Sequence, residues 1–267
     1  IRVIMAELNR ITSHLYWLSI FGIFTGHSTM LMWSFADREL FIDLAEIIGG
    51  TRLTFSYFIP GGVRADIPTG VKEKALQTFK YFRGRLRDYD RVFFDNPILK
   101  SRTVGVGVLP RESAIELGVV GPVLRGSGVK ADVRKDEPYA VYEDLDFEIP
   151  VYPSGDSYAR IMVRRRELEE SMRVIEQCVE KIPDGPVRVR TRQRVPAGEA
   201  VSRTESARGE ISYYVVSDGT TNPYRLKMNT ASFRYLPAMA NVIRGGRIAD
   251  IPIAYMSMDY WPVEADR

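Results

Sequence analysis

Apolar residues recur at three- and four-residue spacing through the first 24 positions, and this pattern predicts a helix over Ile1–Phe24 with one buried face. The same period predicts three further helices, over Thr29–Ile48, Val71–Phe94 and Ser157–Ile182. Helices of this length with one apolar stripe bury that stripe against each other. A helical bundle is therefore the expected framework of the chain.

Between Thr103 and Val151 the pattern changes to β-branched runs (VGVGVL, GVVGPVL and DFEIPVY) broken by Gly and Pro, which predicts loops and small strands. Residues 209–217 and 222–228 flank Asp218-Gly219 and predict a β-hairpin, followed by a short helix near 233–243. The predicted fold class is α+β, a mostly helical bundle with small β elements. We predict a single domain over 1–267, with a helical core (1–100), loops and short strands (101–156), the long helix (157–182), and the hairpin, short helix and C-terminal tail (183–267).

Two charged residues, Glu7 and Arg10, interrupt the apolar face of the first helix. Burying either charge costs several kcal/mol unless it is paired. We therefore expect an ion network between this helix and the segment Asp37-Arg38-Glu39, with a structural role.

Composition narrows the possible functions. The chain has 267 residues, 45% of them hydrophobic and 27% charged, with a net charge of +3, which is typical of a globular protein and far from a nucleic-acid-binding tail. Cys178 is the single cysteine, so the chain can form neither an internal disulfide nor a cluster or zinc site from its own thiolates. The two histidines, His14 and His27, are too few for a metal site by themselves, and a packed or hydrogen-bonded role is favoured for both.

The longest apolar run, Leu15–Phe24, is about half of the roughly 20 residues that cross a bilayer, so we predict no membrane span and no secretion signal. The chain begins at Ile1 inside a helical pattern and without a capping residue. We therefore expect an N-terminal region to precede it.

Several stretches occur in a specific order: IRVIMAELNRITSHL, SFADRELFIDLAEIIGGTR, YFIPGGVRADIP, RTVGVGVL, GPVLRGSGVKADVR, GDSYARIMVR, RGEISYYVVSDGT and the terminal ADR. Together they resemble the quinone-site large subunit (the D-type subunit) of respiratory complex I, also called NADH-quinone oxidoreductase, over essentially the whole chain. The archaeal branch, which takes electrons from reduced deazaflavin or ferredoxin, is similar in the same residues.

The resemblance implies a fold like that of the nickel–iron hydrogenase large subunit. It implies a subunit of a membrane-associated oxidoreductase that passes electrons from NADH, or another low-potential donor, to quinone and translocates protons. The expected partners are an iron–sulfur subunit of the B type and subunits of the C, I and H types, with quinone as substrate and no nucleic acid. The chain would bind no cofactor alone, would not be catalytic alone, and would lie peripherally on the cytoplasmic side of the cell membrane.

For the quinone cavity, the resemblance implies Phe24, His27 and Glu264, with Phe24 standing where the family commonly has an aspartate. Trp261 and Glu264 stand where related nickel–iron hydrogenases carry cysteine ligands, and neither side chain is a thiolate, which argues against nickel–iron chemistry. An alternative role for Glu264 is a structural salt bridge to an arginine such as Arg244 or Arg247.

Near the partner's iron–sulfur cluster, the resemblance implies Arg52, Thr54, Arg125 and Gly126. Many relatives have a histidine at the position of Thr54. The glycines of RGSG are equally consistent with a simple turn.

Two alternatives remain open. The first alternative to the quinone-site subunit is a non-catalytic scaffold that docks the cluster subunit, which Phe24 and Thr54 suggest. The second is a membrane-bound hydrogenase-related subunit that has lost its metal. The single cysteine disfavours a working hydrogenase.

Overall fold

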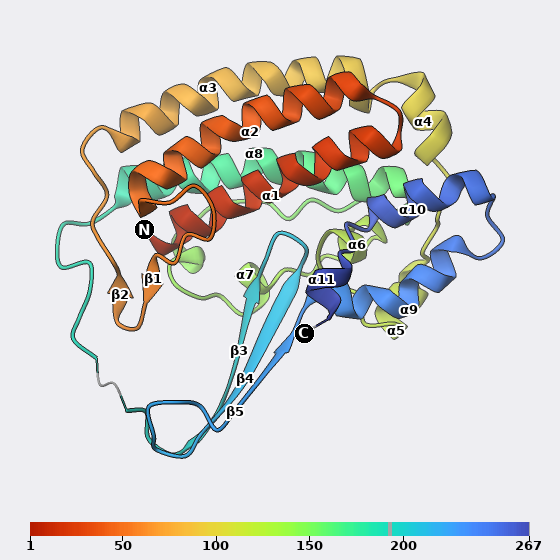
Figure 1. The fold of residues 1–267 in the computed structure, drawn as a ribbon. Coiled ribbons are helices and arrows are strands. Elements are labelled where there is room, and N and C mark those ends of the chain that lie inside the picture. The colour runs from red at the N-terminus through yellow and green to blue at the C-terminus, as the bar shows by residue number, and fades with distance from the viewer. Residues whose placement is uncertain (192–193, 267) are drawn as a thin grey trace.

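The computed structural model describes residues 1–191 and 194–266 and is organised around a hairpin of two long helices, α1 (Arg2–Phe24) and α2 (Ser28–Gly49). Helix α3 (Val71–Tyr89) lies against α2, and α8 (Ser157–Lys181) lies against α1 and α3 (Figure 1). A short π-helical turn, η1 (Asp90–Phe94), extends α3. The four long helices predicted from the apolar period are thus confirmed, and so is the mostly helical fold class.

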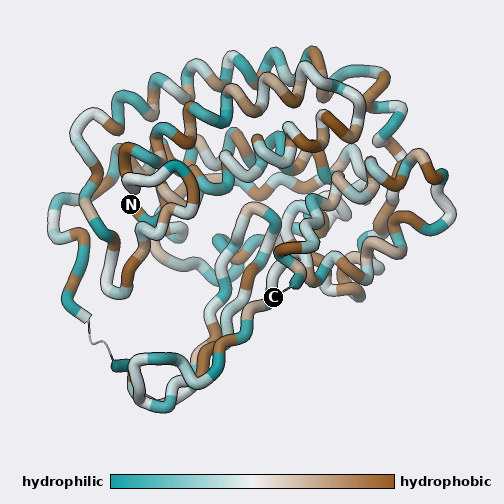
Figure 2. Tube along the Cα trace, in the orientation of Figure 1, coloured by the Kyte–Doolittle hydropathy of each residue, from teal (hydrophilic) through white to brown (hydrophobic). Residues whose placement is uncertain are grey.

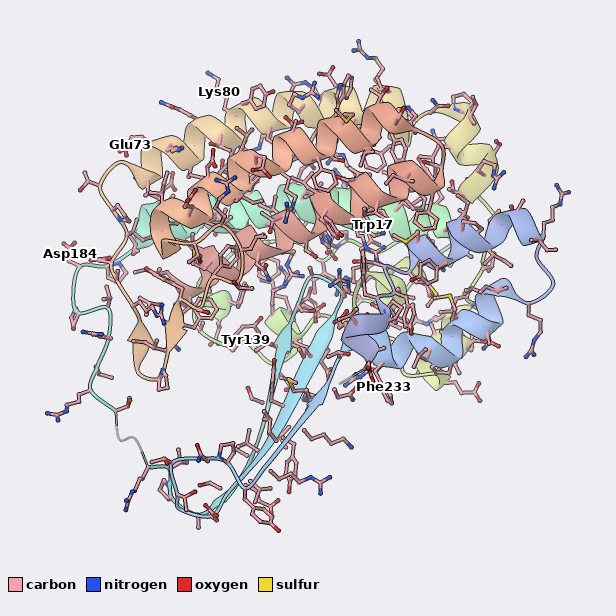
Figure 3. The ribbon with its side chains drawn as sticks, in the orientation of Figure 1. Trp17, Glu73, Lys80, Tyr139, Asp184 and Phe233 are labelled. Carbon is pink, nitrogen blue, oxygen red and sulfur yellow. The ribbon has the colours of Figure 1, made fainter. Side chains whose placement is uncertain are left out.

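The apolar faces of these helices form the main core. Figure 2 shows hydrophobic and hydrophilic positions alternating around each long helix, as the period requires. Phe41 of α2 packs edge-on against Phe82 of α3, with ring centroids 4.9 Å apart. Figure 3 shows Trp17 on the inner side of α1, whereas Glu73 and Lys80 lie on the outer side of α3. Burial of each large apolar side chain contributes about 1.5–3 kcal/mol, so this core holds the bundle together.

The segment between the third and fourth long helices is helical, not stranded. It contains α4 (Pro97–Thr103), α5 (Arg111–Glu116), α6 (Gly121–Gly126), α7 (Val133–Asp136) and the 3₁₀ turn η2 (Tyr142–Asp144). No strand forms within residues 101–156, so the predicted small strands are wrong. The reason lies in glycines with left-handed backbones within or beside the β-branched runs, at φ between 61° and 71° for Gly105, Gly107, Gly118 and Gly121, because this conformation ends an extended segment.

A three-stranded antiparallel sheet, β3 (Gly198–Glu205), β4 (Glu210–Ser217) and β5 (Arg225–Asn229), extends away from the helices (Figure 1). The predicted hairpin is confirmed as β4 and β5, although β5 begins three residues later than expected. Strand β3 was not predicted, because most of its side chains are exposed and give no apolar pattern. A two-stranded hairpin pairs β1 (Phe58–Ile59) with β2 (Gly62–Val63), and Pro60 and Gly61 lie between the two strands.

The C-terminal part packs as short helices against one end of the bundle. It comprises α9 (Ala231–Ile243), η3 (Ile248–Asp250), α10 (Ile251–Ser257) and α11 (Pro262–Ala265). The predicted short helix is confirmed as α9, whereas α10 and α11 were not predicted. Among the described residues, the helices are too short or too polar for any of them to cross a membrane.

The base of the sheet touches α6 through two glycines. A Cβ built on Gly121 would lie 2.3 Å from the carbonyl oxygen of Arg208 and 2.4 Å from the Cα of Gly209. Contacts this short are possible only without a side chain. Gly121 therefore fixes the distance between α6 and the β3–β4 turn.

We predict that Gly121→Ala destabilises the fold by roughly 2–5 kcal/mol, because it combines a left-handed backbone with a steric clash. Gly118→Ala is the matched control, since Gly118 has a φ of +65° but no neighbouring atom within 4 Å of a built Cβ, and it should cost about 1–2 kcal/mol. Chemical denaturation of both variants measures the difference. Equal losses would show that the glycine contact does not determine the position of the sheet.

Candidate functional site

The interior between α1, α6 and α8 holds a cluster of charges with Arg125 at its centre. The Nε and Nη2 atoms of Arg125 donate to Oε1 of Glu167 at 3.0 and 2.6 Å. Its Nη1 atom donates to Oε1 of Glu205 at 2.9 Å and lies 3.3 Å from Oδ2 of Asp132. All four side chains are at most 2% exposed. One guanidinium thus connects α6, α8, β3 and the segment before α7.

Glu7 of α1 forms the second part of this cluster. Its carboxylate accepts hydrogen bonds from Arg134 at 3.0 Å, from the Tyr142 hydroxyl at 2.6 Å and from the Ser171 hydroxyl at 2.6 Å, and Arg10 donates to it at 3.2 Å. Burial disfavours the ionised form, but the charges of Arg10 and Arg134 prevail and lower the pKa of Glu7 to about 2. Glu7 is therefore a structural anion.

Arg10 has other partners than those expected. Its Nη1 and Nη2 atoms donate to the backbone carbonyls of Ser206 and Glu205, both at 2.7 Å, at the base of the sheet. Glu7 and Arg10 are buried and in contact with each other, as the sequence predicted, but the network does not include the 37–39 segment.

Asp37 and Arg38, the predicted partners of Glu7 and Arg10, contact other groups. Asp37 accepts hydrogen bonds from Arg85 at 3.0 Å and from the Tyr89 hydroxyl at 2.5 Å, both of which belong to α3. Arg38 donates to the carbonyl of Thr12 at 3.1 Å. The prediction was wrong on this point because the charged face of α1 meets α8 and the 125–134 segment, and not α2.

His14 closes the cluster on the α1 side. Its Nε2 atom lies 2.7 Å from Oε2 of Glu167, and both side chains are 1% exposed. Burial lowers the pKa of His14, which favours a neutral ring that donates from Nε2. The structure gives this histidine a hydrogen-bonded position. Among the described residues no group of three or more His, Cys, Asp and Glu side chains is arranged to hold a metal ion.

A second polar group lies at the C-terminal tail. The Nε atom of Arg208 lies 3.2 Å from Oδ2 of Asp259 and 3.5 Å from Oε2 of Glu264. Glu264 also accepts a hydrogen bond from the Ser232 hydroxyl of α9. Its side chain is 21% exposed. The alternative predicted for Glu264, a salt bridge, is present, but its partner is Arg208 and not Arg244 or Arg247.

Aromatic rings border this group, which we call the tail site and define as Tyr16, Arg208, Ser232, Trp261 and Glu264. The Trp261 ring lies 5.6 Å from the Tyr16 ring of α1, and the guanidinium of Arg208 lies 5.7 Å from the Trp261 centroid. A partly exposed carboxylate, a guanidinium and a hydroxyl beside two rings can hydrogen-bond the oxygen of a flat ligand and stack on its ring.

The other predicted cavity residues lie at the turn between α1 and α2. Phe24 is 42% exposed, and its ring is 6.3 Å from that of Tyr255 in α10. His27 caps α2, because its Nδ1 atom accepts a hydrogen bond from the amide of Met30 at 3.1 Å. Tyr16 of the tail site precedes Phe24 by eight residues on α1, or about 12 Å along the helix. Tyr16 and Phe24 therefore lie on the same helix but about two turns apart.

The residues predicted near a partner's cluster are not brought together. Arg52 and Thr54 follow the far end of α2, about 33 Å from its start. Arg52 is 43% exposed and pairs with Glu39, Asp43 and Glu46. Thr54 is exposed, with a left-handed φ of +50°.

Arg125 and Gly126, by contrast, lie in and beside the buried cluster. A Cβ on Gly126 would lie 2.8 Å from Cγ of Arg160, so this glycine allows α6 to approach α8. The four residues therefore occupy two separate regions of the molecule.

Sequence reasoning missed most of the residues that complete both sites. In the buried cluster they are Asp132, Arg134, Tyr142, Glu167, Ser171 and Glu205, and at the tail they are Tyr16, Arg208, Ser232 and Asp259. Glu167 stands in the run RRRELEE, which looks like a solvated helix face. Arg134 could have been predicted, because it is the last residue of GPVLRGSGVKADVR, one of the stretches on which the family resemblance rests.

The comparisons with known proteins agree with one another. The family described as "Respiratory-chain NADH dehydrogenase, 49 Kd subunit" matches residues 25–195 and 189–267. The chain is 42% identical over its whole length to the D-type subunit of F(420)H(2) dehydrogenase from Methanosarcina mazei, covering 74% of that protein. It is 43% identical over its whole length to the D-type subunit of NADH-quinone oxidoreductase from Syntrophobacter fumaroxidans, covering 72% of it.

A solved structure is also similar over the whole chain. A chain of the membrane-bound sulfane sulfur reductase, an archaeal respiratory membrane complex, superposes with a TM-score of 0.95 at 39% identity. Our chain covers 74% of that chain.

We predict that Arg10→Met destabilises the chain by roughly 3–5 kcal/mol, because it removes one of the two cations that face Glu7 and leaves two carbonyls at the base of the sheet without their guanidinium partner. Arg166→Met is the control, since Arg166 lies on α8 with its side chain 60% exposed and should change stability by less than about 0.5 kcal/mol. Thermal denaturation compares the two variants. A wild-type melting temperature for Arg10→Met would contradict the structural role of the cluster.

Proposed function

Because the chain belongs to the family of the 49 kDa subunit of respiratory-chain NADH dehydrogenase, we propose that it is the quinone-site subunit, of the D type, in a respiratory membrane oxidoreductase. In this proposal electrons come from NADH or another low-potential donor and reach quinone through an iron–sulfur partner of the B type. The chain supplies one wall of the quinone site and no cofactor of its own. It is a peripheral subunit on the cytoplasmic side, attached through C-, I- and H-type partners.

The tail site is the observation that carries the proposal. At the two positions that the resemblance matches to cysteines of related nickel–iron hydrogenases, this chain has Trp261 and Glu264. The single cysteine, Cys178, is buried in α8, and burial raises the pKa of its thiol to about 11, so it remains protonated at neutral pH. The chain thus offers hydrogen-bonding and stacking groups at the tail, which suit a quinone head group better than a metal.

We assign roles to these residues from their chemistry. Arg208 and, in its protonated form, Glu264 would donate hydrogen bonds to a quinone oxygen, and Trp261 and Tyr16 would stack on the ring. Quinone reduction consumes protons, and Glu264, once protonated from solvent, can pass its proton to the quinone oxygen and then be protonated again.

The turn between α1 and α2 fits the apolar tail of the substrate. Ile23 and Phe24 at the end of α1 and Met32 in α2 are 53%, 42% and 68% exposed, so large apolar side chains are exposed on both sides of this turn. An isoprenoid chain, or a membrane-embedded partner of the H type, would cover it. His27 would hold this turn in shape as the cap of α2, so we give it a positioning role.

The similarity to the sulfane sulfur reductase complex favours a second candidate, in which sulfane sulfur replaces quinone as the acceptor. An assay of the purified complex with both acceptors separates the candidates. Quinone reduction supports the first, and sulfane reduction alone supports the second.

We predict that Glu264→Gln in the assembled complex lowers quinone reduction about 10²-fold or more, because the amide cannot supply a proton. Glu199→Gln is the control, since Glu199 lies on the exposed outer part of β3 and bonds only Tyr214 among the described side chains. Steady-state rates with a water-soluble quinone give the comparison. Full activity of Glu264→Gln with normal assembly would remove Glu264 from the quinone site.

A separate prediction concerns Thr54, which we propose to face the iron–sulfur partner. An imidazole beside a redox centre takes up a proton on reduction, so Thr54→His should introduce a fall of up to about 59 mV per pH unit in the midpoint potential near neutral pH. Thr54→Asn is the control, because asparagine also tolerates a positive φ but does not titrate. Redox titration of the complex by electron paramagnetic resonance measures the slope. Identical slopes in both variants would place Thr54 away from the partner's cluster.

A further inference from the structure

The buried cluster contains more negative than positive side chains. Its guanidiniums are Arg10, Arg125 and Arg134, and its carboxylates are Glu7, Asp132, Glu167 and Glu205, all at most 2% exposed. Three cations face four anions. His14 and the Tyr142 hydroxyl, which already carries its proton, are further titratable groups in direct contact among the described residues. An unbalanced charge in a protein interior costs several kcal/mol, so binding of one proton by the cluster is energetically favoured.

The surroundings decide which group takes this proton. His14 has Glu167 on one side, but burial and the charge of Arg164 lower its pKa. Arg164 follows Arg160 by one turn of α8, is also buried, and is held by the carbonyls of Ser257 and Met258, with no carboxylate within salt-bridge distance among the described residues. This positive charge disfavours an imidazolium. The proton is therefore directed away from His14.

Among the carboxylates, Glu205 has the weakest compensation. Glu7 has four donors, and Glu167 receives two bonds from Arg125 in addition to His14. Glu205 receives one bond from Arg125 at 2.9 Å and one from the amide of Val133 at 3.3 Å.

Moreover, the same Nη1 atom of Arg125 that serves Glu205 also faces Asp132 at 3.3 Å and donates to the carbonyl of Ala131 at 2.9 Å. The other groups around Glu205 are Arg10 on α1, Arg134 on α7 and the Tyr139 hydroxyl, which accepts the hydrogen bond of its amide. One shared guanidinium nitrogen and one long amide hydrogen bond leave this buried carboxylate less compensated than Glu7 or Glu167. Glu205 is thus the natural acceptor of the missing proton.

We propose that the buried cluster binds one exchangeable proton, and that the carboxyl group of Glu205 at the base of the sheet is its site. The proton comes from solvent and converts the Glu205 carboxylate into a carboxylic acid, with no other bond made or broken. Burial, followed by the charge of Asp132, raises the pKa of Glu205 to about 7, so the site is half-occupied near neutral pH.

The position of Glu205 gives the proton a structural consequence. Glu205 ends β3, and its backbone carbonyl and that of Ser206 hold Arg10. Through Arg125 and Glu167 its charge reaches His14 by contacts of 2.9, 2.6 and 2.7 Å. Loss of the proton from Glu205 therefore strengthens the attraction for a proton at His14, and the occupancies of the two groups are anticorrelated.

The test is an infrared titration of the purified complex, with the glutamate carboxyl groups of this chain labelled with ¹³C. A protonated carboxyl group has a C=O stretch that a carboxylate lacks. We expect a labelled C=O band that disappears with a midpoint near pH 7. The band should be absent from Glu205→Gln and unchanged in Glu199→Gln, which removes an exposed glutamate from the same strand.

A band that persists in Glu205→Gln would overturn the assignment to Glu205. If that variant does not assemble, the wild type alone decides, because the absence of any labelled band titrating between pH 6 and 8 overturns the proposal. Neither outcome depends on quinone turnover, so the result is independent of the proposed function.

Discussion

Charge balance in the buried interior is the constraint on which the structure depends. Each ion of the buried cluster costs several kcal/mol to desolvate, and only contacts with the others offset that cost. The contacts come from chain segments far apart in sequence: Glu7 meets Arg134 at 3.0 Å, and Arg125 meets Glu205 at 2.9 Å. No segment can bury its charge before the others arrive. The cluster therefore selects one arrangement of α1, α6, α7, α8 and β3, in addition to the non-directional packing of the apolar core.

The cluster also positions the tail site, although the two do not overlap. Arg125 holds the end of β3, and the β3–β4 turn that follows carries Arg208 to the C-terminal tail. From the other side, the Tyr235 hydroxyl of α9 donates to the carbonyl of Val120 at 2.9 Å, which ties α9 to the start of α6. A guanidinium placed in this way by two anchored segments needs little reorganisation to bind a ligand oxygen.

The sequence alone predicted the features that depend on residues close to each other along the chain. The apolar period located the four long helices, and the polar interruptions at Glu7 and Arg10 indicated buried ions inside one of them. It was insufficient where partners are remote, since nothing near Arg10 indicates that its guanidinium meets carbonyls almost 200 positions later. Glu264 is a second example. The resemblance to the family drew attention to its position, but nothing in the sequence indicates that its partner is Arg208. The short helices of 101–156 were mistaken for strands because β-branched composition outweighed the glycines that interrupt it.

The central claim is that buried charges join the base of the sheet and the long helices into one cooperative unit. Native-state hydrogen exchange of this chain in the assembled complex tests the claim directly. Amides in the middle of α1 and α8 and those around Glu205 should exchange with the same free energy of opening, whereas amides of the outer sheet, near Ala200 and Val215, should exchange through smaller local openings. If the amides around Glu205 open independently of α1 and as easily as the outer strands, the cluster does not couple the sheet to the helices, and the account is wrong.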